Sequence, residues 1–151
     1  PLLRQSHGQA AIIGSVSGHI GLPRRSAYAV SKFALRGLAE SLRVEWEPYG
    51  VGVTLIAPGY IDTPTRQVDN YGRPVGKELH SAPAHLLYPS HKAAYQIRVA
   101  VKKRKPFQVI TGHGLVTVWV QRLLPGLVNL FMRLKARKQS PKESPAVARA
   151  P

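Results

Sequence analysis

The fold is decided by residues 10–57, which read AAIIGSVSGHIGLPRRSAYAVSKFALRGLAESLRVEWEPYGVGVTLIA. Residues 10–14 form a short apolar run closed by Gly and Ser, which favours a strand buried on both faces. Apolar residues then recur at helical spacing over residues 26–47, where Ser26 is expected to cap the helix. Residues 51–57 form a second buried apolar run. Strand, long helix and strand in this order predict a parallel crossover unit.

The alternation continues toward the C-terminus. Residues 58–89 contain five prolines and no sustained period, which predicts a long lid or binding loop. A helix is expected at residues 90–103 and a third strand at residues 107–111. Three side chains of that helix are expected to face inward: Ala94, Ile97 and Val101. Three parallel strands with two crossover helices predict an α/β fold that corresponds to half of a doubly wound sheet.

Two amphipathic helices are expected after this unit, at residues 116–124 and 127–138, with a break at Pro125 and Gly126. The end of the chain is rich in Ser, Pro, Lys and Ala and has no large apolar residue after Val147, which predicts disorder. We therefore expect three parts: a partial α/β domain at residues 1–113, C-terminal amphipathic helices at 114–138 and a disordered tail at 139–151.

The whole chain has a net charge of +15, and most of this charge lies in its second part. Residues 1–89 contain nine Lys or Arg against six acids, whereas residues 90–151 contain thirteen against one. This excess favours an anionic partner such as a membrane surface or nucleic acid. The chain contains no cysteine, which excludes disulfides, thiolate catalysis and Cys-ligated metals. It also contains no run of 18 apolar residues and no signal-peptide pattern.

The segment Tyr28-Ala-Val-Ser-Lys32 places a phenol and an ammonium one helical turn apart. A tyrosine has an ordinary pKa of about 10, and a nearby cation favours its phenolate form, so the pair can act as a general acid and base. The same spacing recurs at Tyr88 and Lys92, but the intervening Pro89 makes a continuous helical face doubtful there. We expect that second match to be accidental.

Ser15 follows the first predicted strand and lies thirteen residues before Tyr28. Ligands bind at the carboxyl ends of strands in open α/β sheets, so Ser15 is placed to donate a hydrogen bond to a substrate oxygen. Ser17 is its competitor for this role. Together with Lys32 and the segment 51–63, these residues resemble the short-chain dehydrogenase/reductase family.

The resemblance implies a Rossmann-like fold, an NAD or NADP cofactor, and Ser15, Tyr28 and Lys32 as catalytic residues. Tyr28 and Lys32 are also expected to contact the cofactor, and Lys32 would bond its nicotinamide ribose. The carboxamide of the nicotinamide would be held by residues that follow the second strand: Pro58, Gly59, Ile61 and Thr63. The family's glycine-rich cofactor turn and catalytic asparagine have no match in this sequence. Because Pro1 also stands where a Met would begin a chain, we expect these residues to be the catalytic half of a longer protein and to be inactive alone.

The expected reaction is hydride transfer between NAD(P) and a carbonyl or alcohol. A hydrophobic substrate is favoured by the mostly apolar residues of the long loop: Tyr60, Tyr71, Leu79, Leu86, Leu87 and Tyr88. The resemblance also implies a homo-oligomer, and we expect a cytoplasmic location with membrane association through the basic helices. The alternative function is a basic module that binds an anionic membrane surface or nucleic acid. Nucleic acid is disfavoured because no aromatic residues interleave with the basic clusters.

No metal site is expected. Three histidines at positions 80, 85 and 91 fall on a segment broken by prolines with no ligand spacing, so we interpret them as solvated. Trp46 and Trp119 are expected in a core or an interface.

Overall fold

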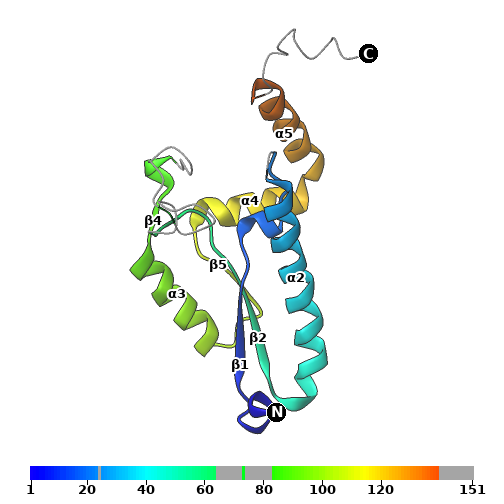
Figure 1. The fold of residues 1–151 in the computed structure, drawn as a ribbon, viewed down its shortest axis with the longest axis vertical. Coiled ribbons are helices and arrows are strands. Elements are labelled where there is room, and N and C mark those ends of the chain that lie inside the picture. Colours follow the sequence, from blue (N-terminus) through cyan, green and yellow to red (C-terminus); the bar gives the residue numbers. More distant parts are fainter. Residues whose placement is uncertain (24, 64–72, 74–82, 140–151) are drawn as a thin grey trace.

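A parallel three-stranded sheet forms the centre of the computed structural model, which describes residues 1–23, 25–63, 73 and 83–139. Its strands are β1 (Gln9–Ile13), β2 (Gly52–Ala57) and β5 (Phe107–Val109), in the order β1-β2-β5. All pairings are parallel, so the three carboxyl ends lie at one edge (Figure 1). The predicted α/β architecture and its three strands are confirmed.

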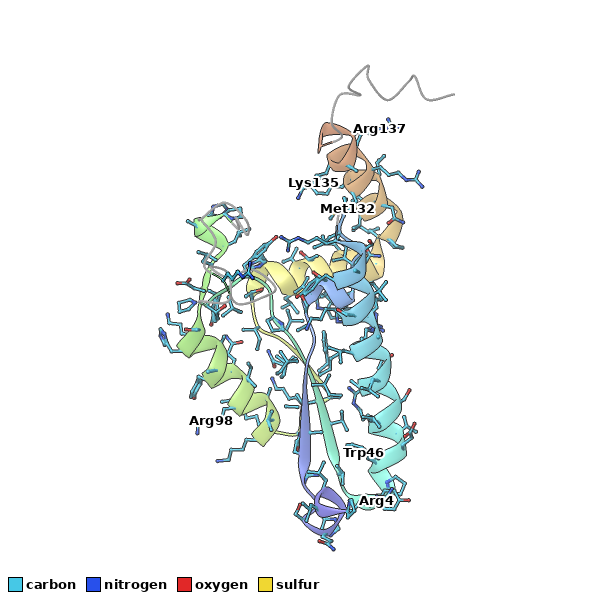
Figure 2. All side chains as sticks on the ribbon, in the orientation of Figure 1. Arg4, Trp46, Arg98, Met132, Lys135 and Arg137 are labelled. Carbon is cyan, nitrogen blue, oxygen red and sulfur yellow. The ribbon has the colours of Figure 1, made fainter. Side chains whose placement is uncertain are left out.

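Two long helices cover opposite faces of this sheet (Figure 1). Helix α2 (Ser26–Trp46) connects β1 to β2, and α3 (Ser90–Lys102) precedes β5. Ile56 packs with residues of α3, whereas its neighbour Leu55 packs with Ala39 of α2, because successive side chains of a strand point to opposite faces. Trp46 lies at the end of α2 away from the carboxyl edge and packs against the second cluster (Figure 2), as the sequence predicts.

Two details of the helix predictions are wrong. Ser26 is the first residue of α2, and the residue that precedes it, Arg25, makes no capping hydrogen bond through its side chain. In α3 the expected inward residue Ala94 is exposed, whereas Ala93 and Ala100 are buried. The expectation holds for Ile97, which packs against the cluster that contains Ile56, and Val101 is partly buried. The error is confined to the first position, where Ala93 and not Ala94 faces the sheet, four residues before Ile97 on the same helical face.

The segment between β2 and α3 contains short elements where a long loop was predicted. Strand β3 (Ile61–Asp62) pairs in parallel with β4 (Tyr88–Pro89), and the Tyr88 amide donates to the Tyr60 carbonyl at 2.9 Å. A 3-10 turn, η4 (Ala84–Leu86), precedes β4. Tyr88 therefore lies in a strand and Lys92 in a helix, which confirms that this second tyrosine and lysine share no helical face. Tyr71, Leu79 and His80 fall outside the described residues.

The predicted C-terminal helix pair is present as α4 (Gly112–Leu123) and α5 (Pro125–Gln139). The chain bends by 114° between these two helices. Helix α4 starts earlier than expected because Thr111 caps it, accepting a hydrogen bond from the Gly114 amide at 3.3 Å. Pro125 opens α5, where a missing amide hydrogen costs nothing. The minor helices are α1 (Leu2–Gln5), η1 (Val16–Gly18) and η2 (Glu47–Tyr49). Residues 140–151 of the predicted disordered tail lie outside the described part of the chain.

Candidate active site

Ser15 stands where β1 ends and η1 begins, at the carboxyl edge of the sheet. Its backbone is extended, and its Oγ accepts a hydrogen bond from the Ser17 amide at 3.1 Å. A hydroxyl that accepts this bond keeps its own hydrogen free to donate elsewhere. Ser17, by contrast, is only 8% exposed. The geometry therefore favours Ser15 over Ser17 as the residue that meets a ligand.

The chain after β1 is hydrogen-bonded to the chain after β2. The Gly14 amide donates to the Ile56 carbonyl at 2.8 Å, and the Val16 amide donates to the Pro58 carbonyl at 3.0 Å. These two bonds extend the pairing of β1 and β2 past the regular strands on both sides of Ser15. The predicted catalytic serine and the predicted cofactor segment that begins at Pro58 consequently lie on adjacent chains at the same edge.

Tyr28 and Lys32 lie on one face of α2, in its first two turns. The Lys32 Nζ is 5.6 Å from the centroid of the Tyr28 ring and donates a hydrogen bond to the Ile13 carbonyl at 3.3 Å. Tyr28 is 44% exposed, so its phenol is accessible to a ligand. The lysine therefore joins the tyrosine-bearing helix to the last residue of β1, two positions before Ser15.

Gly18 explains how η1 comes so close to α2. A Cβ added at Gly18 would lie 2.6 Å from the Lys32 carbonyl oxygen, so only glycine fits between the two elements without a backbone shift. This close approach fixes the Ser15 segment against the turn of α2 that carries Lys32. Three predicted catalytic residues are thus held on two elements in direct contact.

The predicted cofactor residues follow β2. A Cβ added at Gly59 would overlap Thr111 Oγ1 and would lie 2.6 Å from His113 Nε2, so this turn also requires glycine. Ile61 packs its side chain against the cluster that contains Ile56, and it lies opposite Tyr88 in the β3-β4 pair. Thr63 is half-buried at the end of this described segment.

Thr111 and His113 belong to this edge and were missed in the sequence. The His113 ring stacks on Tyr60 with 5.7 Å between centroids, and its Nε2 lies 3.3 Å from Thr111 Oγ1. Thr111 lies two residues after β5, and His113 lies in the first turn of α4. Their closeness to the end of the third strand was a signal for the site, since the carboxyl ends of parallel strands converge. They support the Gly59 turn from the side of β5.

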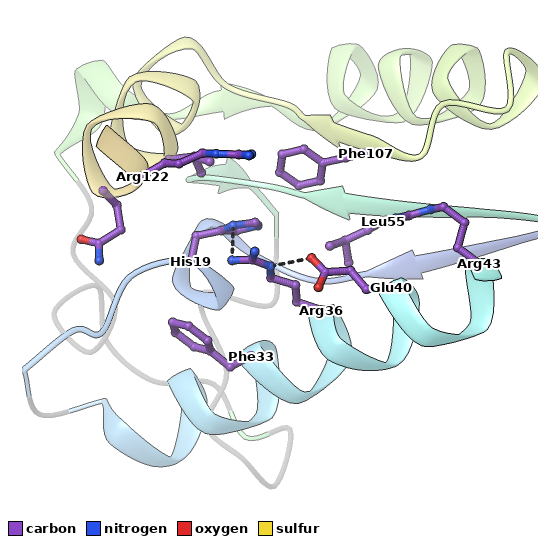
Figure 3. A pocket seen from close by; sticks show the side chains of 10 residues that line it. His19, Phe33, Arg36, Glu40, Arg43, Leu55, Phe107 and Arg122 are labelled. Atoms are coloured by element: carbon purple, nitrogen blue, oxygen red, sulfur yellow. Dashed lines mark hydrogen bonds and ion pairs between the residues drawn. The ribbon is translucent and has the colours of Figure 1, made fainter. Parts of the chain in front are cut away.

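A separate cavity of about 660 Å³ lies between α2, β5 and α4 (Figure 3). Arg36 donates to Glu40 Oε1 at 2.9 Å and lies 3.2 Å from His19 Nδ1. Burial of His19, together with the Arg36 charge, lowers the pKa of its imidazole despite the opposing effect of Glu40. None of the predicted catalytic or cofactor residues is among the described residues that line this cavity. It is therefore distinct from the candidate site.

The remaining expectations concern metals and isolated residues. Within the described residues, no three His, Asp or Glu side chains are grouped to hold a metal ion. His85 and His91 are exposed. Trp119, expected in a core or an interface, is 52% exposed on α4.

Comparison with known proteins supplies the family. Residues 1–73 match the family model described as short chain dehydrogenase. The chain is also 31% identical over 144 residues to dehydrogenase/reductase SDR family member 7B of Xenopus tropicalis, an alignment that covers 91% of this chain and 45% of the relative. The chain belongs to the short-chain dehydrogenase/reductase family.

Other short-chain dehydrogenases/reductases agree with this assignment. The chain is 38% identical over 95 residues to 3-dehydrosphinganine reductase of Danio rerio, covering 63% of this chain and 29% of that protein. A short-chain dehydrogenase from Burkholderia cenocepacia, solved in complex with NADP, has the same fold with a TM-score of 0.68 at 19% identity. That superposition covers 93% of this chain and 51% of the solved one. The chain thus spans about half the length, or less, of the proteins that it matches.

Proposed function

We propose that these residues form the catalytic half of an oxidoreductase that transfers hydride between NAD or NADP and a carbonyl or alcohol. The observation that carries this proposal is the Lys32 contact with the Ile13 carbonyl, which ties the Tyr28 helix to the strand end that bears Ser15. Membership of the family and the accessible Tyr28 phenol support it.

For reduction, Ser15 Oγ donates a hydrogen bond to the substrate carbonyl oxygen and stabilises the negative charge that grows there. The Tyr28 hydroxyl gives its proton to that oxygen, and the Lys32 ammonium stabilises the phenolate that remains. A bound nicotinamide would supply hydride to the carbonyl carbon in reduction and take it up in oxidation. In the oxidation direction, Tyr28 accepts the alcohol proton.

The donors at this edge fit a nicotinamide nucleoside. Lys32 Nζ has three donors, and within the described residues Ile13 provides its one hydrogen-bond acceptor, so two donors remain for ribose hydroxyls. The Gly59 turn lies close against Thr111 and His113, which fix the course of its backbone at this edge. We assign the nicotinamide carboxamide to the backbone of Pro58, Gly59 and Ile61 and to the Thr63 hydroxyl.

The adenine and pyrophosphate end of the cofactor needs groups that this chain lacks. Residues 1–151 contain no glycine-rich turn between a strand and a helix, the motif that binds a pyrophosphate. We therefore propose residues 1–113 as a partial domain that completes the cofactor site together with a nucleotide-binding half. Isolated residues 1–151 are expected to be inactive, and assays of turnover require the longest natural form of the protein.

We propose a hydrophobic ketone or alcohol as the substrate. Leu86 and Leu87 directly precede β4, which begins at Tyr88. Tyr60, whose carbonyl accepts the Tyr88 amide, is 41% exposed. One relative is named 3-dehydrosphinganine reductase, and we take a substrate of that class as a guide here. Ketones of increasing alkyl length, assayed with NADH and with NADPH, test this proposal. A rise in kcat/KM with chain length is expected, and a preference for sugars would contradict it.

The outward face of α2 is proposed as the surface for a second copy of the protein. Val30 and Val44 are 69% and 72% exposed, and they flank Gly37, where an added Cβ would meet nothing within 4 Å. Such a row of small and apolar residues allows two helices to approach closely. The soluble part is assigned to the cytoplasm, and its association with membranes is argued below. Nucleic-acid binding remains the disfavoured alternative.

A further inference from the structure

Helices α4 and α5 leave a continuous set of apolar side chains unpacked. Each of these side chains is between 47% and 67% exposed. On α4 they are Leu115, Val116, Trp119 and Leu123; on α5 and the residue before it they are Leu124, Leu127, Leu130, Phe131 and Leu134. We call this set the α4–α5 apolar face.

The face is a true helical stripe. On α5, Val128 is buried and Met132 and Ala136 are partly buried at spacings of four, so these three residues form the inward side. Leu127, Leu130, Phe131 and Leu134 lie on the opposite side at spacings of three and four. When a helix packs on one side and exposes an apolar surface on the other, that exposed surface marks a binding site for a second apolar partner.

Basic residues border the apolar face, and acids are absent. Helical geometry places Lys135 on one flank of the α5 stripe and Arg133 with Arg137 on the other, while Arg122 borders the stripe of α4. Figure 2 shows Lys135 and Arg137 on the helix that projects beyond the sheet. Residues 79–142 contain no Asp or Glu. The surface is therefore apolar along its centre and positive at its margins.

We propose that the α4–α5 apolar face binds the surface of a bilayer that contains anionic phospholipids. Leucine, phenylalanine and tryptophan side chains would enter the boundary between headgroups and acyl chains, and the flanking cations would bind phosphates. Charge argues against a second copy of the chain as the occupant, since each copy would bring the same cations and neither helix offers an acid to pair with them. In the described part of the chain, no single helix is long and apolar enough to cross a membrane, whereas α4 and α5, bent by 114°, reach that length and apolar composition only as a pair.

The position of this face links it to the candidate site. Helix α4 crosses the carboxyl edge of the sheet, the edge that carries Ser15 and Gly59, and α5 extends away from the same end (Figure 1). Docking through α4 and α5 would bring that edge toward the bilayer, where apolar substrates concentrate. The proposal itself does not depend on hydride transfer, because vesicle binding is measured without a cofactor.

The test is co-sedimentation of the longest natural form with vesicles of phosphatidylcholine alone or with phosphatidylserine. We expect binding to the anionic vesicles at low salt and release at 1 M salt, where exposed charges are screened. Replacing Arg133, Lys135 and Arg137 by Gln should weaken that binding by about 100-fold, since each cation near an anionic surface contributes about fivefold. Phe131→Ser should also weaken it by more than tenfold. Tyr95→Ser, on an equally exposed aromatic of α3, is the matched control and should bind normally.

Several results would overturn the proposal. Equal binding to both vesicle types, or none to either, would remove the anionic surface as the occupant. Retention at high salt would indicate insertion of the helix pair instead of surface binding. Sedimentation velocity provides the other arm: a dimer that Phe131→Ser converts to a monomer would assign the face to a second copy. Circular dichroism of each variant checks that the helix content of the protein is unchanged.

Discussion

Lys32 Nζ lies 3.3 Å from the carbonyl oxygen of Ile13 and donates a hydrogen bond to it. These residues are nineteen positions apart, and their contact fixes helix α2 to the final residue of β1. The same ammonium lies over the Tyr28 ring. One side chain thus joins the element that carries the proposed acid and base to the strand that leads into Ser15.

Lys32→Ala is expected to lower both turnover and cofactor affinity, because it removes the cation beside Tyr28 and the donors assigned to the ribose. We expect kcat to fall at least 100-fold, within the range that acid–base catalysis contributes, and the Kd of NADPH to rise about tenfold or more. Stopped-flow turnover and calorimetric titration of the longest natural form provide the two numbers. Lys92→Ala is the control, since Lys92 is exposed on α3. Unchanged cofactor affinity in Lys32→Ala would show that Lys32 does not bind the cofactor ribose.

Gly59→Ala should loosen the edge of the sheet, because the new methyl group overlaps Thr111 Oγ1 and crowds His113. Overpacking of this kind costs about 1–3 kcal/mol of the free energy of unfolding. We expect the KM for the cofactor to rise more than kcat falls. Gly21→Ala has open space around the added methyl and serves as the control. If Gly59→Ala unfolds with the same free energy as the unmodified protein, the steric explanation is wrong.

The strands and α2 were predictable because their signals are local and long. Six consecutive residues of β2 are buried or nearly so, and α2 repeats its apolar spacing over 21 residues. Tyr28 and Lys32 could be paired because the helix between them fixes their geometry. The β3-β4 pair escaped prediction because two-residue strands have no period and form only when distant segments meet.

The contribution of Thr111 and His113 to the site also depends on tertiary structure. Gly59 and His113 are far apart in the sequence, and the parallel pairing of β2 with β5 brings the chains that follow them to one edge. The inward alanine of α3 was predicted wrongly because Ala93 and Ala94 are indistinguishable by composition. Only the packing of Ala93 against Ile56 decides which of the two is inward.

Ile56→Ala should be strongly destabilising, since Ile56 is fully buried between α3 and the sheet. Deletion of such a side chain costs about 2–5 kcal/mol through lost burial and the cavity that remains. Urea unfolding followed by circular dichroism measures the change. Leu2→Ala, at a position that is 79% exposed on α1, should change the free energy of unfolding by less than about 0.5 kcal/mol. A comparable loss in both variants would show that Ile56 is not in a packed core.

Stability should decrease as pH falls below the ordinary histidine pKa of 6.5, owing to His19. Its pKa is lowered in the folded protein by burial and by Arg36, so the unfolded chain binds the proton first and gains population as the pH falls. His19→Gln should flatten the dependence of the unfolding free energy on pH between about 7 and 5. His85→Gln, at an exposed position, should leave the slope unchanged. An unaltered slope in His19→Gln would remove His19 as its source.

Hydride transfer that depends on Tyr28 is the central claim, and the rate of NADPH oxidation with an apolar ketone tests it most directly. In the longest natural form, Tyr28→Phe deletes the transferable proton and leaves the ring in place. We expect the turnover rate to fall by about 100-fold or more. The Kd of NADPH should change by less than about threefold, because the proton transfer that is lost occurs only in the transition state. Tyr95→Phe should behave as the unmodified protein. Retention of most turnover by Tyr28→Phe would contradict the account.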